Sequence, residues 1–214
     1  MKRDESGNVS RYKARWVVKG YEQRFGIDYD QTFAGVAKNS AWTVALALAA
    51  HLDLEIEQMD VVTAFLRGDI DEIIYVELPH GYEEDGQACK LNRALYGLKQ
   101  SSRLWQQKLR ATLSKLGYHP LPHDNDVTKE GLSGIIIVTY VDDFLLLGRD
   151  PHKIKQLKET LSKKFDMKDL GACTQFLGVR ITRDREKHSI HLAQSLFAQK
   201  VANSFGQQDA KPMQ

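Results

Sequence analysis

The sequence predicts an α+β domain in which a split βαβ antiparallel sheet carries its helices on one face. Three observations support this prediction. Residues 54–61 alternate between apolar and polar side chains, and this pattern ends near Asp60. Two apolar runs within 135–147 flank Asp142 and Asp143. The segment between 54–61 and 135–147 and the segment after 147 both have helical periodicity. In chain order these segments read βαββαβ, which is typical of a split βαβ sheet.

The composition is that of an ordinary soluble globular protein. The 214 residues are 42% hydrophobic and 27% charged, with a formal net charge of +2, which allows one large or two small domains. Two cysteines, Cys89 and Cys173, are too few for a disulfide framework, and we find no signal peptide and no apolar run of membrane-spanning length. We therefore expect an intracellular, reducing compartment and no membrane partner.

Charges are segregated along the chain. Residues 1–24 hold seven Lys/Arg against three acids, and residues 99–115 hold five basic residues and no acid, whereas residues 51–85 hold eleven Asp/Glu against the single Arg67. An acidic zone between basic zones suits a divalent cation beside a polyanion. The alternative is a solvated surface, which explains most charge runs.

Local patterns predict the elements of the first half. Residues 11–19 read as a strand that places Lys13 and Arg15 on one face, which suits gripping a phosphate chain or, equally, keeping an edge strand soluble. The Ala/Leu-rich segment 41–50 predicts a helix capped by Ser40. After the strand over 54–61 we expect, in order, a tight turn over 64–68, a strand over 73–78, a short paired strand over 88–91 and a loop over 96–100.

The second half alternates helices with strands. Leucine spacing from Ser102 predicts an amphipathic helix that stops at Gly117, followed by a loop that contains Pro120 and Pro122 and then by the hairpin of 135–147. We further expect a helix from Pro151 whose six lysines between 153 and 168 form a basic outer face, a strand over 175–181, a returning strand over 189–192 and a helix over 193–205.

The paired aspartates are the main chemical signal. Ionised carboxylates beside buried strands need a cationic partner, and a divalent metal is the strongest one available. The alternative is a simple turn, in which Asp is common. If the hairpin pairs with 54–61, Asp60, Asp142 and Asp143 converge at one sheet edge, which suits two Mg²⁺ ions about 3.5–4 Å apart for phosphoryl transfer. The sequence shows no G-x-S-x-G, Walker-type or H-E-x-x-H motif.

An ordered series of motifs resembles the reverse transcriptase of copia-type long-terminal-repeat retrotransposons, over about residues 12–212. The motifs are YKARWVVKG at 12–20, TFA at 32–34, QMDV at 58–61 with TAFL at 63–66, ALYGLKQ at 94–100, YVDD at 140–143, and MKDLG at 167–171 with FLG at 176–178. The resemblance implies an RNA-directed DNA polymerase that transfers nucleotides to a primer 3′-hydroxyl by a two-metal mechanism.

The resemblance also implies a right-hand polymerase architecture in one domain over 1–214. The parts would be fingers at about 11–52 and 79–100, a ferredoxin-like palm at about 53–78 and 101–192, and a C-terminal helix and tail at 193–214, with no full thumb and no ribonuclease H. The expected partners are an RNA or DNA template with its primer and deoxynucleoside triphosphates, and the expected location is cytoplasmic virus-like particles with access to the nucleus. The oligomeric state stays open.

Site residues follow from the same resemblance. Asp60, Asp142 and Asp143 are expected to be the catalytic acids that bind two Mg²⁺ ions, or Mn²⁺ in their place, with the Val61 carbonyl as a further ligand. The residues expected at the nucleotide are Lys13 and Arg15 on the triphosphate, Phe65 as a gate against the ribose 2′-hydroxyl, Gln100 and Tyr140. Phe176, Leu177 and Gly178 are expected to position the primer end. For Phe65 the alternative is a core aromatic.

Some positions depart from the family pattern. Gly35, Val62, Arg67 and Thr128 stand where Pro, Lys, Asn and an aromatic residue are usual. None of them is an expected metal ligand, although Val62 removes a cation near the site. The alternative function is a truncated or repurposed fragment that binds nucleic acid with little or no polymerase activity. A palm-type nucleotidyl cyclase would share the carboxylate hairpin but would not explain Lys13 and Arg15.

Overall fold

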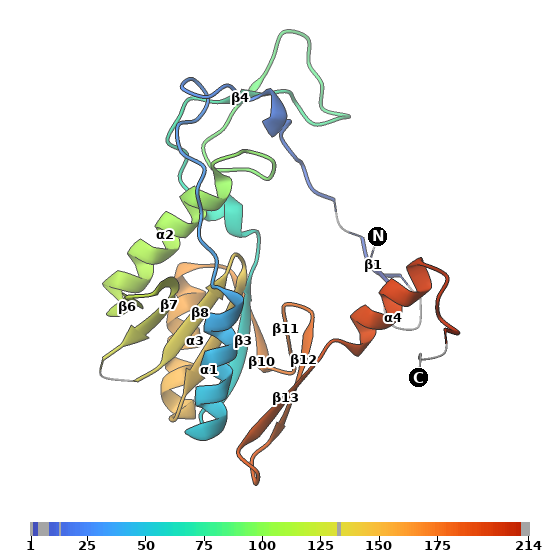
Figure 1. The fold of residues 1–214 in the computed structure, drawn as a ribbon. Coiled ribbons are helices and arrows are strands. Elements are labelled where there is room, and N and C mark those ends of the chain that lie inside the picture. Colours follow the sequence, from blue (N-terminus) through green and yellow to red (C-terminus); the bar gives the residue numbers. More distant parts are fainter. Residues whose placement is uncertain (1, 4–8, 13, 132–133, 211–214) are drawn as a thin grey trace. The chain divides into compact units, whose positions relative to one another are not determined.

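The structure, a computed structural model, describes residues 2–3, 9–12, 14–131 and 134–210 and divides into two compact units (Figure 1). The first unit comprises Met1–Val36 and Thr63–Gly117, and the second comprises Ala37–Val62 and Tyr118–Gln214. Both units are therefore built from two separate stretches of chain. Within the described part of the chain, no helix combines the length and the apolar composition needed to cross a membrane.

A six-stranded antiparallel sheet forms the centre of the second unit. Its strands are β3 (Glu55–Val61), β6 (Tyr118–Leu121), β7 (Asp124–Glu130), β8 (Ile136–Tyr140), β9 (Asp143–Gly148) and β10 (Met167–Ala172). The strand order is β10-β3-β9-β8-β7-β6, and each neighbouring pair is antiparallel. Because β9 lies between β3 and β8, and β10 pairs with the other side of β3, the four strands β10-β3-β9-β8 have the order of a split βαβ sheet. The sequence predicts this arrangement but places its last strand at 175–181 instead of at β10.

Two helices of the second unit, α1 (Asn39–His51) and α3 (Pro151–Lys164), cover opposite faces of this sheet. Ile56 packs in the core cluster with residues of α1, whereas its neighbour Glu57 accepts a hydrogen bond from Lys158 of α3. Successive side chains of a strand point to opposite faces, and Figure 1 shows α1 in front of the sheet and α3 behind it. The expectation of helices on one face concerned the helices predicted from Ser102 and from Pro151, so the position of α1 does not test it.

A separate three-stranded sheet follows β10: its first two strands replace the single strand expected over 175–181, and its third is the returning strand expected over 189–192. It consists of β11 (Gln175–Phe176), β12 (Val179–Asp184) and β13 (Ser189–Ala193), and α4 (Ser195–Ser204) comes after it. Leu177 and Gly178 have positive φ angles of 49° and 79°, and two such residues close a tight turn between β11 and β12. The strand that pairs with β3 is β10, which was not expected.

The first unit is less regular. It contains β1 (Lys2–Arg3), β2 (Val9–Arg11), η1 (Gly20–Glu22), η2 (Ala64–Arg67), β4 (Tyr75–Val76), β5 (Cys89–Lys90) and α2 (Ser101–Lys115). A small apolar cluster holds the β4–β5 region together and consists of Ile74, Leu91, Leu95 and Leu98. The strand expected over 11–19 is wrong for residues 14–19, which have no strand pairing, and Lys13 lies outside the described residues.

Two further expectations need correction. The segment around Pro120 is strand β6 rather than a loop, and it lies at the edge of the sheet, where the missing N–H of a proline can face solvent. Lys158 does not belong to a basic outer face, because its side chain is buried against the sheet. The helices α1, α2, α3 and α4, strand β3 and the β8–β9 hairpin agree with the sequence prediction to within a few residues.

Candidate active site

The pairing of β3 with β9 places Asp60 directly opposite Asp143. Just beyond this pair, the backbone N–H of Val61 donates to the carbonyl oxygen of Asp142 at 2.9 Å. The ladder therefore continues to the last residue of β3 and fixes all three aspartates at the same end of the two strands. This is the convergence that the sequence predicts, and long-range strand pairing produces it.

A strained two-residue turn sets the position of Asp142. Strand β8 ends at Tyr140 and β9 begins at Asp143, and these two residues pair with each other. Val141 and Asp142 thus form the turn, and Val141 has φ = 56°. The left-handed region costs roughly 1–2 kcal/mol for an L-residue and is a genuine outlier for a β-branched one. The strain permits the tight connection that keeps Asp142 next to Asp143 at the tip of the hairpin.

The carboxylates of Asp142 and Asp60 disfavour the charged form of Asp143. Burial raises the pKa of Asp143 above its usual value, and the nearby carboxylates of Asp142 and Asp60 raise it further. The amide of Gln58 opposes this shift, because its Nε2 donates to Asp143 Oδ1 at 3.4 Å. A bound cation would relieve the same repulsion, so the electrostatics of this end of the sheet favour a positive ligand.

The donor set suits Mg²⁺, which prefers carboxylate and carbonyl oxygens. Among the described residues, no group of three or more His, Cys, Asp or Glu side chains is arranged so that it could hold a metal ion. Mg²⁺ is commonly held by one or two carboxylates together with substrate phosphates and water rather than by a complete protein cage. By donor type and by mutual repulsion, Asp60, Asp142 and Asp143 therefore fit the ion.

A cavity of about 430 Å³ opens beside Asp143. It is lined by Gln58, Asp143, Leu170, Ala172, Thr174, Gln175, Leu177 and Gly178. Two of the three residues expected at the primer end, Leu177 and Gly178, thus share a cavity with a catalytic candidate. The third, Phe176, is fully buried, and its ring packs edge-on against Trp42 with centroids 5.8 Å apart. Phe176 anchors the β11–β12 turn to α1 through this contact.

Gln58 is a site residue that the sequence prediction missed. Its Oε1 lies 3.6 Å from the Cys173 thiol while its Nε2 reaches Asp143, so the amide is held from both sides. The signal was present in the alternation of 54–61, which puts Gln58 on the same face of the strand as Asp60. That Gln58 lies next to Asp143 depends on the register between β3 and β9, and the sequence of one strand does not reveal this register.

The residues expected at the nucleotide lie mostly in the first unit, with Tyr140 in the second. Arg15 is exposed and its guanidinium lies 5.4 Å from the centroid of the Tyr96 ring, and Phe65 contacts the same ring with centroids 4.9 Å apart. Tyr140 is half-buried and packs against the main core cluster of the second unit. The structure thus brings Arg15 and Phe65 together through Tyr96, a residue that was not expected at the site.

Gln100 has a different environment from the one expected of a nucleotide contact. Its side chain is 0% exposed. The Nε2 group donates to the Asp28 carbonyl at 2.8 Å, and the Oε1 atom accepts from Gln23 at 3.0 Å. Both ends of the amide are therefore engaged in holding the loop that precedes α2 against residues 23–28.

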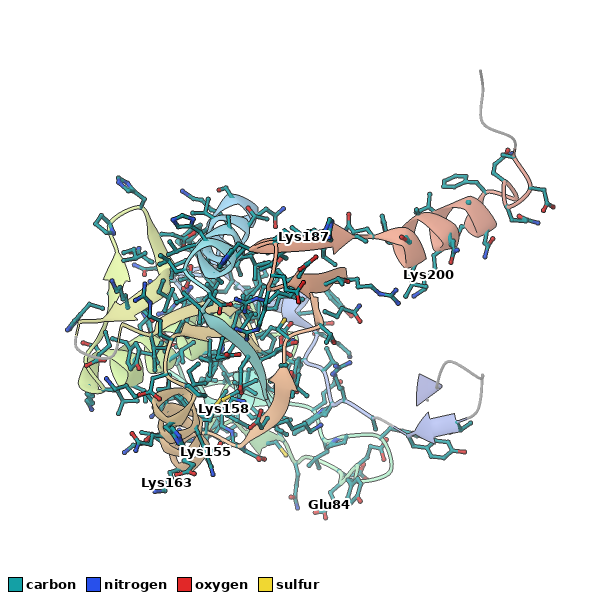
Figure 2. All side chains as sticks on the ribbon, turned by 90° about the horizontal axis from the view of Figure 1, so that it is seen from below. Glu84, Lys155, Lys158, Lys163, Lys187 and Lys200 are labelled. Carbon is teal, nitrogen blue, oxygen red and sulfur yellow. The ribbon has the colours of Figure 1, made fainter. Side chains whose placement is uncertain are left out.

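A buried cation supports β3 from the other face of the sheet. Lys158 of α3 donates to Glu57 of β3 and, at 2.6 Å, to Asp169 of β10. In Figure 2 Lys158 lies inward along α3, whereas Lys155 and Lys163 project outward. Burial works to lower the pKa of Lys158, but the hydrogen bonds to Asp169 and Glu57 outweigh it and raise the pKa above the usual value. The contact joins α3, β3 and β10.

Comparison with known proteins gives one consistent family. The family model described as reverse transcriptase (RNA-dependent DNA polymerase) matches residues 1–214. The chain is 45% identical over 219 residues to the retrovirus-related Pol polyprotein from transposon TNT 1-94 of Nicotiana tabacum, covering 100% of this chain and 16% of that protein. It is 35% identical over 217 residues to the retrovirus-related Pol polyprotein from transposon RE1 of Arabidopsis thaliana, covering 99% of this chain and 15% of that protein.

A more distant relative comes from yeast. The chain is 30% identical over 190 residues to the transposon Ty1-DR5 Gag-Pol polyprotein of Saccharomyces cerevisiae, covering 83% of this chain and 10% of that protein. The chain therefore spans 16% or less of the length of these three relatives.

Proposed function

Because this chain belongs to the reverse transcriptase (RNA-dependent DNA polymerase) family found in retrotransposon Pol polyproteins, we propose that it extends a primer 3′-hydroxyl on an RNA template by two-metal nucleotidyl transfer. The observation that carries the proposal is the pairing of Asp60 with Asp143, next to Asp142. A reverse transcriptase domain implies a nucleic acid template and nucleotide substrates, and we propose that these are a primed RNA or DNA strand and deoxynucleoside triphosphates.

In this proposal Asp60, Asp142 and Asp143 hold two Mg²⁺ ions, with the Val61 carbonyl as a further ligand. When bound, Mg²⁺ would lower the pKa of the primer 3′-hydroxyl and neutralise negative charge on the phosphates. The protein needs no nucleophile of its own. Its contribution at this end of the sheet is to hold three carboxylates in a fixed arrangement by strand pairing, and Gln58 restrains one oxygen of Asp143.

The other groups bind and orient the reactants. Leu177 and Gly178 line part of the cavity beside Asp143, and we assign this part of the wall to the primer end. Arg15 carries an exposed guanidinium, which can form paired hydrogen bonds with phosphate oxygens. Phe65 supplies a bulky ring that can exclude a ribose 2′-hydroxyl. Positioning and charge stabilisation of this kind account for most of the catalysis of phosphoryl transfer.

Primer extension tests the proposal. The wild-type chain should extend oligo(dT) on poly(rA) in the presence of Mg²⁺, and Asp142→Asn should abolish extension while circular dichroism and the melting temperature show an intact fold. Asp85→Asn, an exposed change in the same acidic zone, should keep wild-type activity. Near-normal extension by Asp142→Asn would contradict the assignment, and a wild type that retains primer-template in filter binding without extending it would support a binding fragment.

A further inference from the structure

Tyr96 joins two of the residues proposed to act on the nucleotide. Its half-buried ring meets the Phe65 ring edge-on, with centroids 4.9 Å apart and an interplanar angle of 60°. The guanidinium of Arg15 lies over the same ring, 5.4 Å from its centroid. Both contacts are of attractive types, because a ring edge and a cation each favour the electron-rich face of an aromatic ring.

The backbone around Tyr96 is held in place by a close approach of two chain segments. The N–H of Val18 donates to the Tyr96 carbonyl at 2.8 Å. A Cβ atom at Gly97, where φ is 96°, would lie 2.1 Å from the Val18 oxygen, and a Cβ at Gly20 would lie 1.9 Å from the Gly97 oxygen. Only glycine permits this approach at either position. The contact fixes Tyr96 relative to the segment that carries Arg15.

Tyr96 also forms part of a cavity wall in the first unit. The cavity has a volume of about 540 Å³, and Arg15, Thr63, Leu66 and Tyr96 are among its lining residues. This volume is within the usual range for small-molecule sites. Thr63 and Leu66 belong to the same short segment as Phe65, which does not line the cavity itself but contacts the ring of Tyr96.

We infer that Tyr96 is a specificity-determining positioning residue, whose ring sets the orientation of Phe65 and of the Arg15 guanidinium and thereby the discrimination between deoxyribonucleotides and ribonucleotides. The inference rests on the proposed function, in which Phe65 meets the sugar and Arg15 meets the triphosphate. It adds to that function a residue that acts on the nucleotide through Phe65 and Arg15. The ring faces and edges make the contacts, so the phenolic hydroxyl is dispensable.

Steady-state extension with a single dNTP or the matching rNTP tests the inference. Tyr96→Leu removes the aromatic ring, and Tyr96→Phe keeps it. The matched control is Tyr29→Leu in the same unit, because Tyr29 makes the same two types of contact with other partners. Its ring is edge-on to Phe25 with centroids 5.8 Å apart, and the Lys99 ammonium lies 4.7 Å from its centroid.

The ratio of kcat/KM for the dNTP to kcat/KM for the rNTP is the readout, since general loosening of the unit would lower both values together. We expect Tyr96→Leu to reduce this ratio roughly three- to tenfold and to raise KM for the dNTP. Tyr96→Phe and Tyr29→Leu should keep the wild-type ratio. If Tyr96→Leu does not fold, Tyr96→His is measured in its place, because it keeps a smaller aromatic ring.

Several outcomes overturn the inference. One is an unchanged ratio in Tyr96→Leu, and another is an equal fall in Tyr29→Leu. A third is a fall of the same size in Tyr96→Phe, which would assign the effect to the hydroxyl. A wild-type chain that extends no primer would overturn the proposed function together with this inference, whereas an active wild type with an unaffected Tyr96→Leu variant overturns the inference alone.

Discussion

Asp60 on β3 and Asp143 on β9 are direct partners across an antiparallel strand pair. Like charges in directly opposed positions destabilise a sheet, by an amount comparable to the roughly 0.2–1 kcal/mol of a favourable pair. The sheet nevertheless carries this pair beside Asp142, at the end where a strained turn closes the hairpin. The arrangement is unfavourable for the metal-free fold and favourable for binding a cation.

Asp143→Asn should therefore stabilise the metal-free protein at neutral pH. The folded-state pKa of Asp143 is raised by burial and by Asp142 and Asp60, so its contribution to stability is fully present below the unfolded pKa of about 3.9 and is lost as the pH rises through the folded pKa. The advantage of the variant should shrink as the pH falls from 7 to about 4. Urea unfolding in EDTA measures the difference in the free energy of unfolding between the variant and wild type. Asp30→Asn, at an exposed aspartate, is the control. A variant that is less stable than wild type at pH 7 would contradict the repulsion.

Lys158→Met should destabilise the second unit by about 2 kcal/mol. Removing one partner of a buried ion pair costs roughly 3–5 kcal/mol, and we expect less here because the Asp169 side chain is 56% exposed. The pKa of Lys158 is raised in the folded state. Its contribution to the free energy of unfolding is therefore intact below about pH 10 and is lost only as the pH rises through the folded pKa. Urea unfolding of Lys155→Met, an exposed change on the same helix (Figure 2), provides the comparison. Equal effects of the two substitutions would refute the buried contact.

Val141→Asn should raise the stability of the β8–β9 hairpin by about 1 kcal/mol, since Asn adopts the left-handed conformation more readily than a β-branched residue. Thermal unfolding measures the gain. Val36→Asn, at an exposed valine without a positive φ, should give none. A lower melting temperature for Val141→Asn would show that the valine side chain contributes more packing energy than its backbone strain removes.

Cys173 should resist alkylation in the native protein. Burial raises the pKa of its thiol to about 11, so at pH 8 about one molecule in a thousand carries the reactive thiolate, since 8 − 11 = −3. Cys89 is only half-buried, and we expect iodoacetamide to label it at least about tenfold faster. Peptide mapping by mass spectrometry separates the two sites, and labelling in urea should equalise them. Equal native rates would be inconsistent with a buried Cys173.

Local patterns were sufficient for the parts of the fold that depend on near neighbours. Helices α1, α2 and α3 and the β8–β9 hairpin follow from periodicity and turn residues within each segment. Lys158 could also have been placed correctly, because it follows Ile154 by four positions and precedes Leu161 by three, on the buried stripe of α3. The sequence prediction placed all six lysines on a basic outer face because of their charge, and it did not use this spacing.

Residues far apart in the sequence decided the remainder. The pairing of β10 with β3, the burial of Gln100 against Asp28 and Gln23, and the meeting of Arg15, Tyr96 and Phe65 all join segments that no local pattern connects. By itself the sequence determined helices α1, α2, α3 and α4, strand β3, the β8–β9 hairpin and the family, and it singled out the three carboxylates as candidates. Only the tertiary structure decided strand register and side-chain partners, because these depend on which distant backbone groups satisfy one another's hydrogen bonds.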